Sequence, residues 1–371
     1  MIKIFIVRPS TAHNAYKVAA DSFAELAARI TGADVDILTD NASLPDDSRP
    51  IVILGSDAVN HLSAKLYFER VVDGFDIRYN TDDYSIISAQ WKNHQVLILS
   101  GGRPRAAIYA VYRYFELFCG CCYFWDGDRI PSAGTLPFDN IHIAESPRFE
   151  YRGLRYFAHR SLHRFQAEHW SFDDWKQEID WILKKRLNMF MLRIGLDDLF
   201  QKAFPDLVSY PDLTQPLPEA GDGFDDRTLF WSLEYRGELR RQLLQYAFER
   251  DLWHPEDCGT MTHWYSRTPL EYLEKRKPSL LSQKSRGYSE ATGLVWDIRD
   301  DRNLNDYFKL TDTHINEYGK PELFHTIGLA ERSYSDDREE NMRLKLNVCR
   351  RIASHLKEKY PNAPLLNASW D

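Results

Sequence analysis

The sequence predicts an α/β protein in two parts: a small N-terminal α/β sandwich domain in residues 1–146, and the beginning of a (β/α)8 TIM barrel in residues 147–371. Short apolar segments alternate with helix-like segments up to residue 146, as in a sheet covered by helices. A proline-rich connection with Pro131, Pro137 and Pro147 then indicates a domain boundary. After it, longer units of one strand and one helix repeat, which is the order that builds a barrel of parallel strands.

Five apolar segments of the first part are predicted to be strands, because they are short and end at turn-forming residues. They cover residues 2–7, 35–38, 51–55, 84–88 and 96–100. Residues 104–119 repeat apolar side chains at helical spacing, and Pro104 suits the first turn of a helix. We expect this helix to pack on the sheet.

Five further strands are expected in the second part. They cover residues 151–158, 187–195, 252–261, 323–329 and 364–370, with helices expected after Ser171 and in residues 234–250, 304–318 and 338–359. A closed barrel needs eight strands, so five strands make an incomplete barrel. We expect the closing strands to lie beyond Asp371.

Charge and composition limit the classes of binding partner that the protein is expected to have. Lys and Arg total 47 against 55 Asp and Glu, a net charge of −8, so neither nucleic acid nor an anionic membrane is an expected partner. The N-terminal apolar run stops at Arg8 and is too short for a signal peptide or a membrane span. We therefore expect a cytoplasmic protein, or a secreted one if a leader has been removed. The sequence leaves the oligomeric state open.

Candidates for chemistry follow the strands, because the carboxyl ends of barrel strands meet at one mouth. Glu331 follows the apolar fourth strand, where its surroundings can raise the pKa of a carboxyl enough for general acid catalysis. The alternative is that Glu331 only pairs with Arg332 or caps the next turn. His263, after strand three, either binds substrate or is a structural histidine. The remaining candidates are His159, Arg193, Asp198, Trp264 and Trp370.

No cofactor or metal is expected. The sequence lacks the GxGxxG, GxxxxGK[ST] and GxSxG patterns. His254, Glu256, Asp257 and His263 lie together without HExxH spacing, which makes a metal site improbable. The five cysteines match neither a disulfide framework nor a zinc site, so we expect reduced thiols.

Several runs of residues resemble glycoside hydrolases. Residues 82–131, DDYSIISAQWKNHQVLILSGGRPRAAIYAVYRYFELFCGCCYFWDGDRIP, resemble the non-catalytic α/β domain that precedes the barrel in families 20, 67 and 89. Residues 147–195 look like the opening of the family 89 barrel, that of the α-N-acetylglucosaminidases, with an EIDW helix after an aromatic-rich loop. ELFHTIGLAERSYSDD and YPNAPLLNASWD are similar to that family's fourth and fifth strands.

The resemblance implies an exo-acting glycosidase with a carbohydrate substrate and a two-carboxylate mechanism that retains configuration. Glu331 matches the family's general acid/base, His263 its strand-three histidine and Trp370 the tryptophan after strand five, although Ala330 stands where the family usually has Asn. Trp264 and Trp370 offer rings that can stack on a sugar. The second carboxylate is expected beyond Asp371, so that this chain alone would be inactive. A non-catalytic carbohydrate-binding relative is the alternative.

Overall fold

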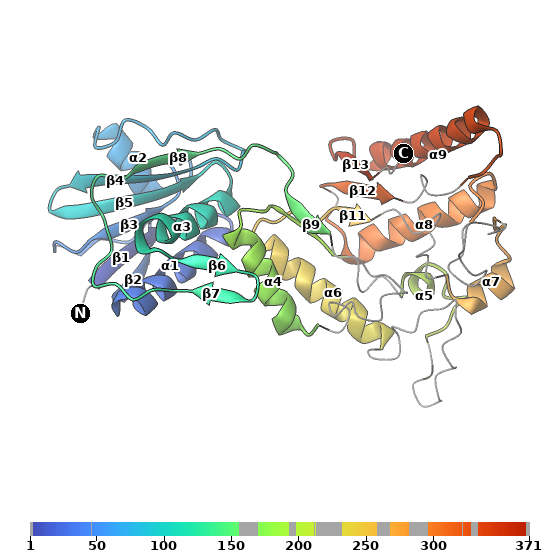
Figure 1. Ribbon diagram of the computed structural model, residues 1–371, viewed down its shortest axis with the longest axis horizontal. Coiled ribbons are helices and arrows are strands. Elements are labelled where there is room, and N and C mark those ends of the chain that lie inside the picture. Colours follow the sequence, from blue (N-terminus) through green and yellow to red (C-terminus); the bar gives the residue numbers. More distant parts are fainter. Residues whose placement is uncertain are drawn as a thin grey trace. The chain divides into compact units, whose positions relative to one another are not determined.

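The computed structural model describes residues 3–45, 47–155, 170–192, 198–210, 212, 232–257, 268–281, 296–320, 322–327 and 333–368 (Figure 1). The chain divides into two compact units, which are described separately. The first consists of Met1–Leu154, Lys176–Phe190 and Tyr246–Leu252, and the second of Arg155–Trp175, Met191–Gln245 and Trp253–Asp371. Within the described ranges, no helix combines the length and the apolar character needed to cross a membrane.

A six-stranded mixed sheet forms the centre of the first unit. Its order is β2-β1-β3-β5-β4-β8, in which β1, β2, β3 and β5 run parallel while β4 is antiparallel to both β5 and β8. The bounds are Lys3–Arg8 (β1), Asp34–Thr39 (β2), Ile51–Leu54 (β3), Tyr84–Trp91 (β4), His94–Gly101 (β5) and His142–Glu145 (β8). The five predicted strands are thus confirmed, and β8 is an addition.

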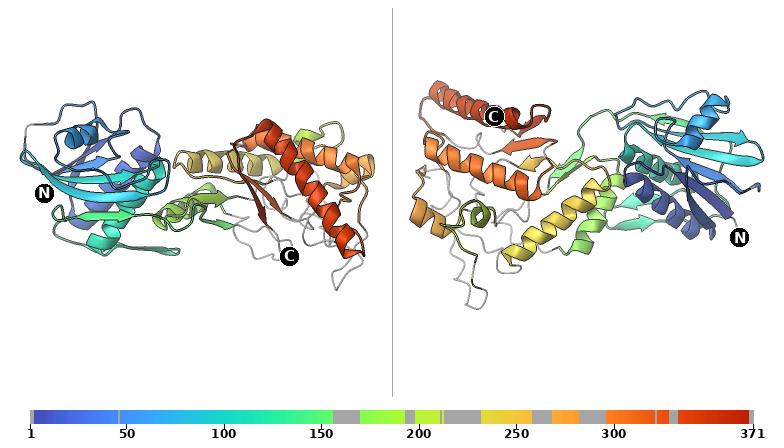
Figure 2. Two further views of the ribbon diagram at one scale, coloured as in Figure 1. Left: turned by 90° about the horizontal axis from the view of Figure 1, so that it is seen from above. Right: turned by 180° about the vertical axis from the view of Figure 1, so that it is seen from behind.

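Helices cover both faces of this sheet. Helices α1 (Ala15–Thr31) and α3 (Pro104–Cys119) pack together on one face, and α2 (His61–Phe68) lies on the other (Figures 1 and 2). Sheets buried on both faces need continuous apolar strands, and the apolar residues of β1 and β3 are buried without alternation. Helix α3 has the predicted bounds, with Pro104 in its first turn and Gly120 in the left-handed conformation (φ 70°) at its end.

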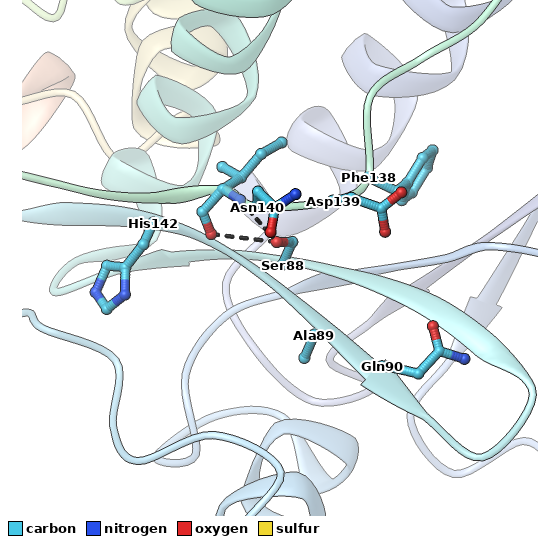
Figure 3. Close-up of a pocket in the computed structure, with 8 residues that line it drawn as sticks. Ser88, Ala89, Gln90, Phe138, Asp139, Asn140 and His142 are labelled. Atoms are coloured by element: carbon cyan, nitrogen blue, oxygen red, sulfur yellow. Dashed lines mark hydrogen bonds between the residues drawn. The ribbon is translucent and has the colours of Figure 1, made fainter.

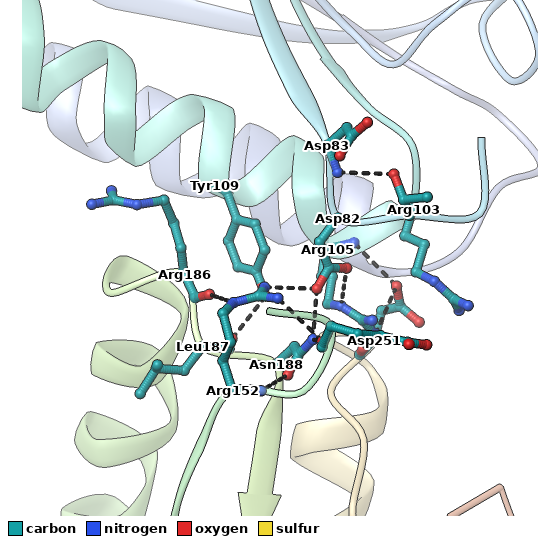
Figure 4. Close-up of polar contacts among 12 residues, drawn as sticks. Asp82, Asp83, Arg103, Arg105, Tyr109, Arg152, Arg186, Leu187, Asn188 and Asp251 are labelled. Atoms are coloured by element: carbon teal, nitrogen blue, oxygen red, sulfur yellow. Dashed lines mark hydrogen bonds and ion pairs between the residues drawn. The ribbon is translucent and has the colours of Figure 1, made fainter. Parts of the chain in front are cut away.

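A buried network of charged and polar side chains ties distant segments of the first unit together (Figure 4). Asp82 accepts hydrogen bonds from Arg105 Nε (2.6 Å), Arg152 Nη2 (2.7 Å) and Asn188 Nδ2 (2.7 Å). Arg105 is fully buried and also donates to the carbonyl oxygen of Asp251 (2.6 Å). The network therefore joins the loop before β4, the start of α3 and three segments from later in the chain.

The remaining elements alternate short strands and helices. The strands are β9 (Gly153–Arg155), β10 (Met189–Met191), β11 (Glu256–Asp257), β12 (Phe324–Ile327) and β13 (Leu365–Ala368), and a small hairpin of β6 (Cys122–Phe124) and β7 (Gly127–Arg129) belongs to the first unit. The helices are α4 (Phe172–Lys184), α5 (Leu199–Ala203), α6 (Leu233–Phe248), α7 (Leu270–Arg276), α8 (Asp301–Tyr318) and α9 (Arg338–Lys359). Strand β9 pairs with β10, and β11, β12 and β13 form a second sheet.

The second sheet is parallel throughout. Glu256 pairs with Phe324, which pairs in turn with Leu365. Helices α7 and α8 lie between β11 and β12 in the chain, and α9 lies between β12 and β13. Strands at all five predicted positions, and the predicted helices between them, are confirmed within the described residues. An α/β fold with a mixed sheet is therefore established, whereas the incomplete barrel stays a prediction.

The start of α4 shows why the sequence signals work locally. Ser171 and Asp174 cap the helix reciprocally: Asp174 Oδ2 accepts from the backbone and hydroxyl of Ser171, and Ser171 Oγ accepts from the Asp174 backbone at 3.4 Å. The buried face of the helix consists of Trp175, Ile179, Ile182 and Leu183. The predicted cap and apolar stripe are both confirmed.

Candidate functional site

The three parallel strands of the second sheet place their carboxyl ends at one edge. Strand β11 ends at Asp257, β12 at Ile327 and β13 at Ala368. In parallel α/β sheets the segments that follow the strands gather at this edge, and ligands bind there. Most predicted site residues come shortly after these ends in the chain, which makes this edge the candidate site; His159 and Arg193 follow β9 and β10 instead.

Six of the candidate site residues lie outside the described residues. They are His159, Arg193, His263, Trp264, Glu331 and Trp370. Their contacts and their grouping in one cavity therefore stay predictions. The structure does describe the strands that precede them, each in the predicted order.

His325 is a candidate that the sequence analysis misses. The ring of Phe324 packs against Tyr360, which directly follows α9, with 5.4 Å between ring centroids. Because successive side chains of a strand point to opposite faces, His325 lies on the face opposite Phe324. It is 5% exposed. A histidine inside an otherwise apolar strand, shortly before Glu331, is the sequence signal that identifies it.

A buried polar cluster lies between the strands and helices α6 and α8. It comprises Arg240, His254, Glu256 and His314, each at most 2% exposed. Glu256 Oε2 lies 3.1 Å from His314 Nε2 and 3.5 Å from His254 Nδ1. The Arg240 guanidinium, which can only donate, lies 3.4 Å from His254 Nε2 and donates to the Leu192 carbonyl oxygen at 2.9 Å.

Burial and charge set the protonation of this cluster. Burial would raise the pKa of Glu256, but the charges and hydrogen bonds of His254 and His314 outweigh it and hold that pKa well below its usual range. Burial lowers the pKa of His254, against the opposing effect of Glu256. At neutral pH, Glu256 is therefore a carboxylate.

The cluster accounts for two of the residues considered as metal ligands. His254 and Glu256 face each other rather than an open position. Among the residues that the structure describes, no group of three or more His, Cys, Asp or Glu side chains is arranged to hold a metal ion.

Asp198, another candidate that follows strand two, belongs to a contact between helices. Its carboxylate accepts from Tyr318 (2.8 Å) and Tyr210 (3.2 Å), and it pairs with Lys202 Nζ at 2.8 Å. It is 2% exposed. This carboxylate therefore holds α5 to α8.

A pocket of about 540 Å³ lies on the first unit, beside β4 and β8 (Figure 3). Its lining consists of Ser88, Ala89, Gln90, Phe138, Asp139, Asn140, Ile141 and His142. Ser88 binds the Ile141 backbone, Asp139 accepts from Gln95, and His142 pairs with Asp76. Its polar groups serve these internal contacts, and none of the predicted site residues lines it.

Comparisons with known proteins point to glycoside hydrolases. No family model matches the chain. Over 104 residues, 28% of this chain, it is 25% identical to the human alpha-N-acetylglucosaminidase, and the match spans 14% of that protein. A family 89 glycoside hydrolase from Clostridium perfringens, solved with 2-acetamido-1,2-dideoxynojirmycin, has a TM-score of 0.58 at 12% identity. That match covers 96% of this chain and 37% of the clostridial one.

A second structural relative is a family 20 exo beta-N-acetylglucosaminidase from Vibrio harveyi. Its TM-score is 0.52 at 12% identity, with 99% of this chain and 52% of the other covered. The chain therefore spans about a third to a half of these solved relatives. The chain is a relative of the family 89 glycoside hydrolases. The similarity in sequence covers a limited segment, and the similarity in fold covers nearly the whole chain.

Proposed function

We propose that the chain contains the substrate-binding edge and the general acid/base of an exo-acting glycoside hydrolase, similar to the α-N-acetylglucosaminidases. The observation that carries the proposal is the parallel order β11-β12-β13, with Glu331 in the segment after the middle strand. Parallel strands direct the segments that follow them to the same edge, and the fold relatives are glycosidases. Residues 1–146 form the accompanying non-catalytic α/β domain, and residues 147–371 the first part of a (β/α)8 barrel.

The chemistry proposed for Glu331 is proton transfer. Glu331 donates a proton to the glycosidic oxygen as the bond to the sugar breaks, and then takes a proton from the attacking water. A second carboxylate, about 5–5.5 Å away in a retaining enzyme, attacks the anomeric carbon. None of the residues in this chain is assigned that second role.

The other proposed site residues bind the sugar. His159, Arg193 and His263 carry the hydrogen-bonding groups that fix hydroxyl and acetamido oxygens. Trp264 and Trp370 provide aromatic faces that stack on the apolar side of the ring. The substrate of the clostridial family 89 enzyme is GlcNAc-alpha-1,4-galactose, and we propose a terminal sugar of the same class.

The test uses two leaving groups. If Glu331 is the acid, Glu331→Gln should slow hydrolysis of an alkyl N-acetyl-α-glucosaminide by about 10²–10⁴-fold, measured in a protein that also supplies the second carboxylate. With a dinitrophenyl glycoside, the first step of Glu331→Gln, in which the bond to the leaving group breaks, should be much less impaired. The dinitrophenolate leaves without needing a proton. Pre-steady-state release of the phenol measures this step.

The control is Glu322→Gln. Glu322 is exposed, pairs with Lys320 and lies just before β12, and its replacement should leave both rates unchanged. Equal slowing on both substrates would count against Glu331 as the acid. In a protein that also supplies the second carboxylate, sugar binding without any hydrolysis, unaffected by Glu331→Gln, would favour the non-catalytic relative instead.

A further inference from the structure

The buried cluster of Arg240, His254, Glu256 and His314 contacts three strands of the predicted barrel. Arg240 extends from α6 and donates to the carbonyl oxygen of Leu192, the residue directly after β10. His254 Nε2 lies 3.3 Å from the same oxygen. Among the described residues, no strand pairing joins β10 to β11. Within the described residues, the side chains of Arg240 and His254 therefore connect the end of β10 to β11.

Glu256 extends this link to the next strand. Its Oε1 accepts from the backbone N–H of Lys320, in the turn between α8 and β12, at 2.7 Å. Its own N–H donates to the Leu323 carbonyl oxygen at 2.9 Å. Its Oε2 faces His314 of α8 at 3.1 Å. The carboxylate thus holds β11 to the end of α8 and to the turn before β12, while the backbone of the same residue binds the residue directly before β12.

The charges of the cluster make it sensitive to substitution. Arg240 and Glu256 are fully buried, and His314 lies within 3.2 Å of the Arg240 guanidinium and 3.1 Å of the Glu256 carboxylate. Removing one partner of a buried polar group leaves the others without compensation, which is more damaging than losing a surface pair. A change at Glu256 should therefore loosen its strand contacts together.

We propose that Glu256 and Arg240 are positioning residues that fix β10, β11 and β12 relative to one another, and thereby align the segments that carry Arg193, His263 and Glu331. The expected effect on the reaction rate rests on the proposed function. The alignment of the strands is independent of that function. Both residues act through the strands and not by contact with the sugar. Displacing a reacting group by about 1 Å can cost about 10²-fold in rate, which is why such alignment matters.

The test compares Glu256→Gln with a matched control, Asp306→Asn, in the full chain. Asp306 is also a buried carboxylate of the second unit, but it accepts from Tyr272 and Arg276 and so holds α7 to α8 rather than a strand. Amide hydrogen exchange should accelerate about tenfold or more at residues 254–257 and 323–327 in Glu256→Gln, and remain near wild type there in Asp306→Asn. In a protein that also supplies the second carboxylate, kcat for a glycoside substrate should fall at least about tenfold in the first variant alone, with little change in KM.

Arg240→Lys provides a second, milder variant, because lysine keeps the charge but loses the planar fork that reaches Leu192. Arg240→Lys should accelerate amide hydrogen exchange at residues 189–192. This variant also keeps the proposal testable if Glu256→Gln does not fold. Exchange that rises equally in Glu256→Gln and Asp306→Asn, or that stays at wild-type rates in Arg240→Lys, would overturn the proposal. If the wild-type chain neither binds nor cleaves a sugar, the proposed function fails, while the exchange comparison still decides the alignment.

Discussion

Gly237 shows at the scale of one residue how closely the helices of the second unit pack. It lies within α6, where glycine lowers helix stability relative to alanine. A Cβ atom at this position would lie 2.6 Å from Tyr318 Oη and 3.0 Å from Asp198 Oδ2. The missing side chain thus makes room for the hydrogen bond between Asp198 and Tyr318.

Gly237→Ala should therefore destabilise the protein by about 1–3 kcal/mol, despite the higher helix propensity of alanine, because the added methyl group overpacks this contact. Urea unfolding followed by circular dichroism measures the change. Gly74→Ala is the matched control, since its Cβ would meet nothing within 4 Å. Equal stability of the two variants would show that the contact is not tight.

His254 gives the second unit a predicted acid sensitivity. Its folded-state pKa lies below the ordinary 6.5, so the unfolded chain takes up the proton more readily than the folded one. The contribution of neutral His254 to the free energy of unfolding is fully present above about pH 6.5. It is lost as the pH falls below that value, by up to about 1.4 kcal/mol per pH unit. Glu256, whose pKa is also lowered, adds an effect of the same sign below its ordinary 4.5.

The predicted acid sensitivity is tested by the midpoints of urea unfolding, measured between pH 7.5 and pH 5. They should fall with pH in the wild type and fall less steeply in His254→Gln. His61→Gln serves as control, because the His61 side chain is 80% exposed. A midpoint that is constant over this range in the wild type would contradict the assignment.

The candidate site was predictable only in part. Glu331, His263 and Trp370 follow from the rule that chemistry gathers after barrel strands, and strands β11, β12 and β13 confirm the order on which that rule depends. The contacts of Glu256 and Arg240 with His314 could not be predicted, because His314 is far from both residues in the sequence. Local spacing carries no information about such contacts.

At the scale of helices and strands, the predicted bounds hold where a cap marks the end. Helix α9 has its predicted bounds, and the side chain of Asp337 accepts from the Glu340 backbone at 2.7 Å. Helix α1 is harder to recognise, because its buried face is largely alanine and contrasts weakly with its polar face. Strand β8 is a four-residue edge strand with alternating exposure and gives little apolar signal.

Asp82 determines how several elements of the first unit are held together. Asp82→Asn should cost about 3–5 kcal/mol, because the fully buried Arg105 would lose its charged partner. Chemical unfolding measures the loss. Asp34→Asn removes an exposed pair with Lys3 and should change stability by less than about 1 kcal/mol. Similar small losses in both variants would mean that the network is not a main support of this unit.

At the scale of the whole molecule, the alternation of strands and helices predicted the α/β class and the parallel sheet of the second unit. It could not establish a closed barrel, since closure depends on pairings between strands that local patterns do not encode. The fold relatives are glycosidases of families 89 and 20.

Equilibrium binding of a sugar to the full chain tests the central claim most directly, because it does not require turnover. Calorimetric titration with GlcNAc-alpha-1,4-galactose and 2-acetamido-1,2-dideoxynojirimycin should show binding that Glu331→Gln retains. His263→Ala and Trp370→Ala should each weaken it by about tenfold or more, since a lost hydrogen bond or stacked ring costs about 1–2 kcal/mol. Phe68→Ala, at a side chain that is 82% exposed on α2, should leave it unchanged. Absence of binding to either compound, or binding that none of these site substitutions weakens, would contradict a sugar site at the carboxyl ends of β11, β12 and β13.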